Sequence, residues 1–166
     1  VGERQVLVQG DDASIVQPEF SPDGGHLAYA SDEDGWWHLY VRDLDSGESR
    51  QLTEGEFEMA GPAWVQGMRS YDWEADGDGL LAVRNDRGRM ELLRVGLDGS
   101  AEALEAVDEY DGFRQPVVSN TGRVAFIGSA ADTPPRVVTW AAGEEGRVER
   151  RSSSERITDD RLADIE

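Results

Sequence analysis

The sequence predicts an all-β fold, a partial β-propeller of about three four-stranded antiparallel blades with one leftover outer strand before them. The chain repeats itself with a period of roughly 44–54 residues. Each repeat holds short apolar segments separated by turns rich in Gly, Asp, Asn and Pro. No segment shows a sustained helical pattern with caps. Four short strands in each such unit are typical of a propeller blade.

The front half of the repeat is clearest in two copies, residues 17–31 and 115–129. Both open with Gln-Pro, place Ser four residues later and Gly seven residues later, and continue into an apolar strand that ends in Ser. A middle copy begins with Gly-Pro-Ala-Trp at 61–64 and reaches its turn, Asp-Gly-Asp-Gly, at 76–79. We therefore expect three consecutive blades.

The back half of the repeat, residues 47–53, also matches residues 2–8, so a leftover outer strand is expected before the first blade. The repeats predict residues 1–9 as the outer strand of a preceding blade, 17–60, 61–114 and 115–153 as the blades, and 154–166 as an exit segment.

Composition excludes several classes of protein. The 16 basic and 35 acidic residues give a net charge of −19, which argues against a nucleic-acid binder that neutralises phosphates. The absence of Cys excludes disulfides, thiolate zinc sites and a cysteine nucleophile. No apolar run reaches the roughly 20 residues of a membrane-spanning helix. All basic residues are Arg, a pattern that favours a halophilic source, with a GC-rich genome as the alternative.

The segment Phe20-Ser21-Pro22-Asp23-Gly24 is typical of a hairpin turn between inner strands. Pro sets φ at the first turn position, Asp bonds nearby backbone, and Gly accepts a positive φ. With the apolar strand that follows, this segment resembles the propeller repeat of TolB-like proteins and of prolyl oligopeptidase family peptidases.

A longer pattern is similar to acylaminoacyl-peptidase and dipeptidyl-aminopeptidase-like enzymes of that family. The pattern comprises residues 31–41, Gln-Leu-Thr at 51–53, Gly-Pro-Ala-Trp-Val at 61–65, Arg-Ser-Tyr at 69–71 and the tail at 150–154. The resemblance implies a propeller that gates or positions short peptides for a C-terminal α/β-hydrolase serine exopeptidase domain, which these residues do not include. The alternative is a TolB-like interaction module with no enzymatic partner domain.

Catalytic residues are not expected within this chain, and we predict no cofactor or metal. Ser49 has a Gly two residues before it but Gln51 two residues after it, so it does not complete a Gly-x-Ser-x-Gly elbow. The paired carboxylates at 32–34, 43–45 and 76–78 complete no calcium-binding loop. We interpret them as turn residues and solvated charge.

The connections between blades are the best candidates for peptide contact. Glu56 and Glu58 lie near the end of the first blade, and Asp108 and Glu109 lie near the end of the second. Their carboxylates could attract the free amino terminus of a peptide, and the alternative is that they are solvated acidic loops.

Aromatic residues are interpreted mainly as packing groups. Trp64 is expected in the opening strand of the second blade and Trp140 in a later strand of the third, where both would fill space between blades. Strand alternation places Trp36 and Trp37 on opposite faces, one packed and the other in contact with a neighbour or solvent. His38 is expected to have a structural role and His26 to face solvent.

Three open blades would leave apolar faces without neighbours. We therefore expect the isolated chain either to self-associate or to be marginally stable in low salt. The expected partners are short peptides and the hydrolase domain, with no nucleic acid and no membrane, and the expected location is the cytoplasm.

Overall fold

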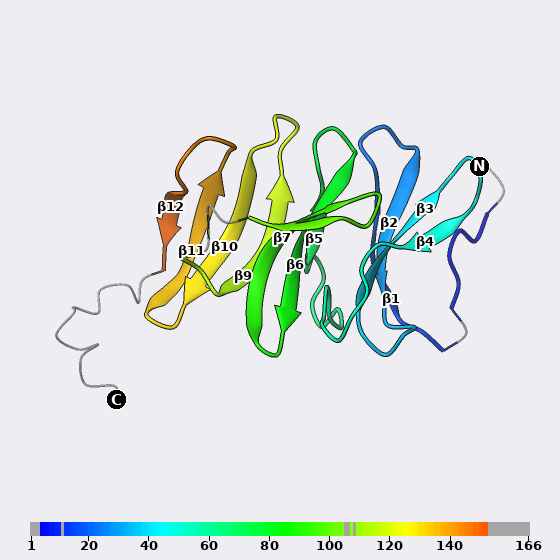
Figure 1. Ribbon diagram of the computed structural model, residues 1–166, viewed down its shortest axis with the longest axis horizontal. Helices are drawn as coiled ribbons and strands as arrows, with labels where there is room; N and C mark the ends of the chain where they lie inside the picture. The colour runs from blue at the N-terminus through cyan, green and yellow to red at the C-terminus, as the bar shows by residue number, and fades with distance from the viewer. Residues whose placement is uncertain (1–3, 11, 105–106, 108, 153–166) are drawn as a thin grey trace.

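The computed structural model describes residues 4–10, 12–104, 107 and 109–152. Its strands form three four-stranded antiparallel sheets, ordered β1-β2-β3-β4, β5-β6-β7-β8 and β9-β10-β11-β12. The three sheets lie side by side in chain order (Figure 1). The strands are β1 (Ile15–Phe20), β2 (His26–Ser31), β3 (His38–Asp43), β4 (Ser49–Gln51), β5 (Tyr71–Trp73), β6 (Gly79–Asp86), β7 (Arg89–Gly96), β8 (Ala101–Ala103), β9 (Gly112–Val118), β10 (Val124–Ala130), β11 (Thr133–Trp140) and β12 (Arg147–Arg151).

This arrangement confirms the prediction of an all-β partial propeller built from three four-stranded blades. No described helix is long and apolar enough to cross a membrane. The described part of the expected outer strand, residues 4–10, is not paired with a strand. An outer strand needs the third strand of a blade as its partner, and here β4, β8 and β12 already occupy that position.

The turn between β1 and β2 has the chemistry predicted for it. Gly24 N donates to Ser21 O at 2.9 Å, and the Asp23 carboxylate accepts hydrogen bonds from Gly25 N at 2.9 Å and Ser21 Oγ at 2.6 Å. Gly24 has a φ of 75°, a conformation that favours glycine. The turn therefore fixes the hairpin locally.

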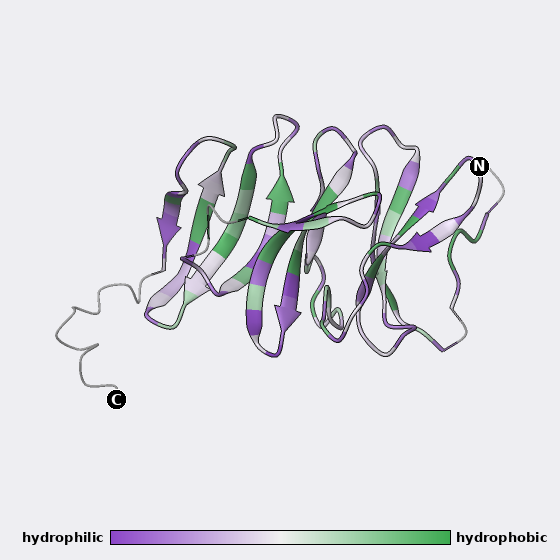
Figure 2. Cartoon of the chain, in the orientation of Figure 1, coloured by the Kyte–Doolittle hydropathy of each residue, from purple (hydrophilic) through white to green (hydrophobic). Residues whose placement is uncertain are grey.

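The second sheet is buried on both faces, which explains the continuous apolar run in β6. Leu80 and Ala82 pack toward the first sheet, while Leu81 and Val83 pack toward the third. Alternate residues of a strand point to opposite faces, so one strand serves both cores. Figure 2 shows hydrophobic residues along the strands that face neighbouring sheets, and hydrophilic residues on the outer strands β4 and β12.

The structure bears out the predicted placement of Trp140 and of the Trp36–Trp37 pair and corrects that of Trp64. Trp140 lies in β11 and is buried between the second and third sheets, and Trp37 is buried while Trp36 is 38 % exposed. Trp64 is 83 % exposed and lies thirteen residues after the end of β4 in a connection, not in the opening strand of the second blade. That blade opens at Tyr71, because the Tyr71-Asp72-Trp73 segment supplies two buried aromatic side chains on one face.

Candidate functional site

Four connections lie at one end of the sheets and form a surface that we call the loop face. They are the described parts of 32–37, 52–70, 87–88 and 104–111, which join β2 to β3, β4 to β5, β6 to β7 and β8 to β9. Backbone hydrogen bonds link these connections to their neighbours. Met59 N donates to Trp37 O at 2.8 Å, and Met90 N, at the start of β7, donates to Asp111 O at 3.1 Å. The β6–β7 hairpin at the lower edge of Figure 1 lies at this end.

Glu56 and Glu58, two of the predicted contact residues, lie beside the β6 side of that hairpin. The half-buried Glu58 accepts a hydrogen bond from Trp37 N at 2.7 Å through Oε2, and its backbone pairs with Asn85. The exposed Glu56 places a carboxylate oxygen 3.9 Å from Arg87 Nη2. Of the two, Glu58 also lines a cavity.

Glu109 lies on the β7 side of the hairpin, apart from Glu56 and Glu58, and is exposed. Its neighbour Tyr110 is buried, and burial together with the nearby Glu109 carboxylate raises the pKa of the Tyr110 hydroxyl. The fourth candidate, Asp108, lies outside the described residues. The role of these four residues in peptide contact stays a prediction.

A cavity of about 490 Å³ lies on the loop face between the second and third sheets. We call it the methionine cavity, since Met59, Met68 and Met90 all line it. Such a volume lies within the range of about 300–1,000 Å³ that holds small ligands. Its other lining residues are Glu58, Ala60, Val65, Arg69, Ser70, Val83, Asn85, Phe113, Arg114, Gln115 and Ile127.

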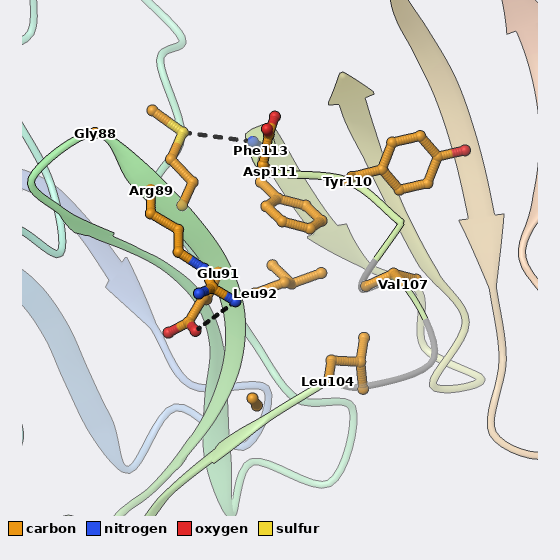
Figure 3. A pocket seen from close by; sticks show the side chains of 11 residues that line it. Gly88, Arg89, Glu91, Leu92, Leu104, Val107, Tyr110, Asp111 and Phe113 are labelled. Carbon is orange, nitrogen blue, oxygen red and sulfur yellow. Dashed lines mark hydrogen bonds and ion pairs between the residues drawn. The ribbon is translucent and has the colours of Figure 1, made fainter. Parts of the chain in front are cut away.

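A second cavity, of about 590 Å³, lies farther out along β7 and β8. Figure 3 shows Leu92, Leu104, Val107 and Phe113 turned toward a common space. The Met90 sulfur accepts a hydrogen bond from Phe113 N at 3.4 Å, and both of these residues also line the methionine cavity. The two cavities therefore share one wall.

A polar cluster joins the innermost strands of the three blades. Arg69 Nη1 lies 2.7 Å from Glu19 Oε1 and 3.4 Å from Asp72 Oδ1. Asp72 Oδ2 in turn accepts from Val118 N at 2.8 Å. Burial raises the pKa of the Glu19 carboxyl; Arg69 opposes that rise, and Asp72 reinforces it.

Two glutamines brace the segment that leads into β5 from opposite sides. Gln17 accepts from Ser70 N at 2.8 Å and donates to Tyr71 O at 2.6 Å. Gln115 accepts from Arg69 N at 2.9 Å and donates to Gly67 O at 3.1 Å. These are the glutamines of the two Gln-Pro repeats, and both have positive φ, 50° and 54°.

The described residues present no metal centre: no three His, Asp or Glu side chains among them are placed to hold an ion. His38 is buried, and its ring nitrogens contact Thr53 Oγ1 at 3.2 Å and Gly55 O at 3.1 Å. That pairing gives His38 a structural role, as expected. Ser49 lies at the start of β4, without the strand-turn-helix context of a nucleophile elbow.

Three blades with shared cores define a partial β-propeller, and the comparisons with known proteins narrow this class. A family model described as the dipeptidyl peptidase IV N-terminal region matches residues 6–78. The chain is 32% identical over 114 residues to the uncharacterized protein Atu1656 of Agrobacterium fabrum, covering 68% of this chain and 36% of that protein.

Solved structures of a peptidase and of a TolB-like protein also match the chain. A puromycin-hydrolyzing peptidase of Mycobacterium tuberculosis matches with a TM-score of 0.75 at 26% identity, over 89% of this chain and 22% of the peptidase. A TolB-like protein of Agrobacterium tumefaciens matches with a TM-score of 0.61 at 26% identity, over 80% of this chain and 49% of that protein.

These matches identify the chain as propeller blades of the kind found in prolyl oligopeptidase family peptidases, with TolB-like repeats. The resemblance expected from the sequence is thereby confirmed. The chain spans about a third of the curated relative and about a fifth of the matched peptidase.

Sequence reasoning missed Arg69, the glutamine braces and the methionine cavity. The repeated Gln-Pro was visible as a repeat, but nothing in it showed that the amide reaches a neighbouring blade. The three methionines could have been singled out because they are the only ones in 166 residues. Their convergence depends on how the second and third sheets pack.

Proposed function

We propose that these blades admit and position short peptides for a C-terminal α/β-hydrolase serine exopeptidase domain that the 166 residues do not include. The observation that carries the proposal is the methionine cavity on the loop face, with the predicted contact residue Glu58 in its wall. The related peptidase structures support it, because they are a puromycin-hydrolyzing peptidase and a puromycin hydrolase.

Exposed apolar side chains on the loop face support contact between this face and another protein domain. Trp64 and Val65 are 83 % and 65 % exposed, and Met68 is 42 % exposed. All three lie in the connection from β4 to β5, and exposed apolar clusters commonly mark interaction surfaces. The loop face is therefore the proposed side from which the hydrolase domain receives a peptide.

The test uses the native gene product and compares an aminoacyl anilide carrying a free amine with its N-acetylated form. Glu58→Gln should reduce kcat/KM for the free-amine substrate about tenfold, since one charge-assisted contact is worth about 1.4 kcal/mol. The N-acetylated substrate should be unaffected. Glu54→Gln, a change at an exposed position of the same connection, is the matched control. Equal loss on both substrates would contradict a contact with the amino terminus.

A second candidate function is a TolB-like interaction module without an enzymatic domain. The Ser-Pro-Asp-Gly turn and the match to the TolB-like protein favour it. The intact mass of the native protein, with the reading frame beyond Glu166, separates the two candidates. A continuation carrying Gly-x-Ser-x-Gly, then Asp, then His supports the peptidase. Hydrolysis by the pure 166-residue chain would contradict both.

A further inference from the structure

All three methionines of the chain line one cavity, although they come from distant parts of the sequence. Met59 and Met68 belong to the connection from β4 to β5, and Met90 belongs to β7. Met59 is 1 % exposed and Met68 is 42 % exposed, so the lining extends from the core to the surface. Unbranched thioether side chains adapt their shape to an apolar ligand, which suits a site that takes more than one side chain.

The remaining apolar wall comes from both neighbouring sheets. Val83 lies in β6, Phe113 in β9 and Ile127 in β10. Ser70 and Asn85 add a hydroxyl and an amide to the lining. A wall that is mainly apolar with a few polar groups is typical of small-ligand sites, in which the polar groups fix the orientation of the ligand.

The cavity also has a cation available to a ligand. Arg69 is occupied by Glu19 at 2.7 Å and Asp72 at 3.4 Å. Arg114 is exposed on β9, and its guanidinium makes no hydrogen bond or ion pair with the described residues. An Arg fork binds a carboxylate through two parallel hydrogen bonds, so Arg114 is suited to an anionic group at the cavity.

We propose that the methionine cavity binds the C-terminal residue of a short peptide, with its apolar side chain among the methionines and its α-carboxylate on Arg114. The inference rests on the proposed function in that it takes the ligand to be a peptide. Ser70 and Asn85 favour a peptide over a fatty acid, because they can bond amide groups that a fatty acid lacks.

The three methionines supply a direct probe of the cavity. We would label the chain with ¹³C-methyl methionine and record methyl spectra during titration with Gly-Gly-Leu, its C-terminal amide, and hexanoate. We expect all three methyl signals to shift with Gly-Gly-Leu, and the amide and hexanoate to bind at least about fivefold more weakly. Arg114→Gln should weaken Gly-Gly-Leu binding about tenfold, as expected for the loss of one charge-assisted contact.

Arg150→Gln is the matched control, since it makes the same change of charge at an exposed position of β12 and should leave the affinity unchanged. Unmoved methyl signals would overturn the cavity assignment. Unchanged affinity in Arg114→Gln would overturn the carboxylate contact, and equal binding of hexanoate would overturn the peptide. None of these outcomes bears on the proposed function, which is judged by anilide hydrolysis in the gene product.

Discussion

Gln17 and Gln115 occupy equivalent repeat positions, but their hydrogen bonds differ in burial. Both bonds of Gln17, with Ser70 N and Tyr71 O, are partly buried. Of the two bonds of Gln115, the one with Arg69 N is partly buried and the one with Gly67 O is exposed. We predict that Gln17→Ala lowers the free energy of unfolding by about 2 kcal/mol, because it leaves buried polar groups unpaired. Gln115→Ala should cost about 1 kcal/mol. Urea denaturation measures both, and a reversed order would contradict the burial argument.

Glu19 makes stability depend on pH in a direction that can be tested. Its folded-state pKa is raised chiefly by burial, so its contribution to stability is full below the unfolded pKa of about 4.3 and is lost as pH rises through the folded pKa. We therefore predict that the unfolding free energy of the parent chain, minus that of Glu19→Gln, falls between about pH 4 and pH 7.

Urea unfolding of both proteins across that pH range measures this difference, in which the titration of all other carboxyls cancels. A difference that rises with pH would show that Arg69 outweighs burial and lowers the Glu19 pKa.

At the scale of single elements, the turns test whether backbone conformation or space limits substitution. Gly24 has a φ of 75° and Gly61 does not have a positive φ, yet a Cβ at either would meet nothing within 4 Å. We predict that Gly24→Ala lowers the free energy of unfolding by about 1 kcal/mol, since only its φ disfavours a side chain. Gly61→Ala should stay within about 0.5 kcal/mol of the parent. Equal effects in thermal unfolding would rule out φ as the cause.

The connection from β4 to β5 shows where sequence reasoning fails for an element. Gly-Pro-Ala-Trp-Val at 61–65 has the alternation of an inner strand, but β5 forms at Tyr71–Trp73, where Tyr71 pairs with Ala82. The pairing partner in β6 decides which segment becomes the strand, and that partner cannot be read from local alternation. The β1–β2 hairpin could be predicted because its turn carries its own hydrogen bonds.

Trp64 gives this correction a measurable consequence. Because the indole is 83 % exposed, we predict that Trp64→Ser changes the free energy of unfolding by less than about 0.5 kcal/mol. Trp140→Ser, at a buried position of β11, should cost about 3–5 kcal/mol. Chemical denaturation of the two variants compares them directly. If Trp64→Ser lowered the free energy of unfolding as much as Trp140→Ser, the prediction that Trp64 packs in an inner strand would be right after all.

At the scale of the whole molecule, the number of blades could be predicted because each blade repeats a local pattern. The candidate site was predictable only in part. Glu58 could be placed because connections between blades meet at one end. The methionine cavity depends on Met59, Met90 and Phe113 lining one space although they lie on separate elements. Long-range packing of this kind leaves no local pattern in the sequence.

The outward faces of the first and third sheets are covered unequally. Leu7 and Val8 share a hollow with Tyr29 and Tyr40, so residues before β1 shield part of the first sheet. On the third sheet Val137 is 38 % exposed, on the side of β11 opposite the core residue Val138. The outward face of the third sheet is therefore the expected surface for self-association.

We predict that the chain self-associates through this face, and more strongly at about 1 M salt than at about 0.1 M. The reason is that the Debye length falls from about 10 Å to about 3 Å and screens repulsion between copies that each carry a charge of −19. Val137→Glu should give monomers at both salt concentrations. Val65→Glu, an equal change at an exposed site on the loop face, should still associate. Light scattering with size-exclusion chromatography measures the mass. A folded monomer of the parent chain at both concentrations would contradict the prediction, and unaltered association of Val137→Glu would move the contact to another face.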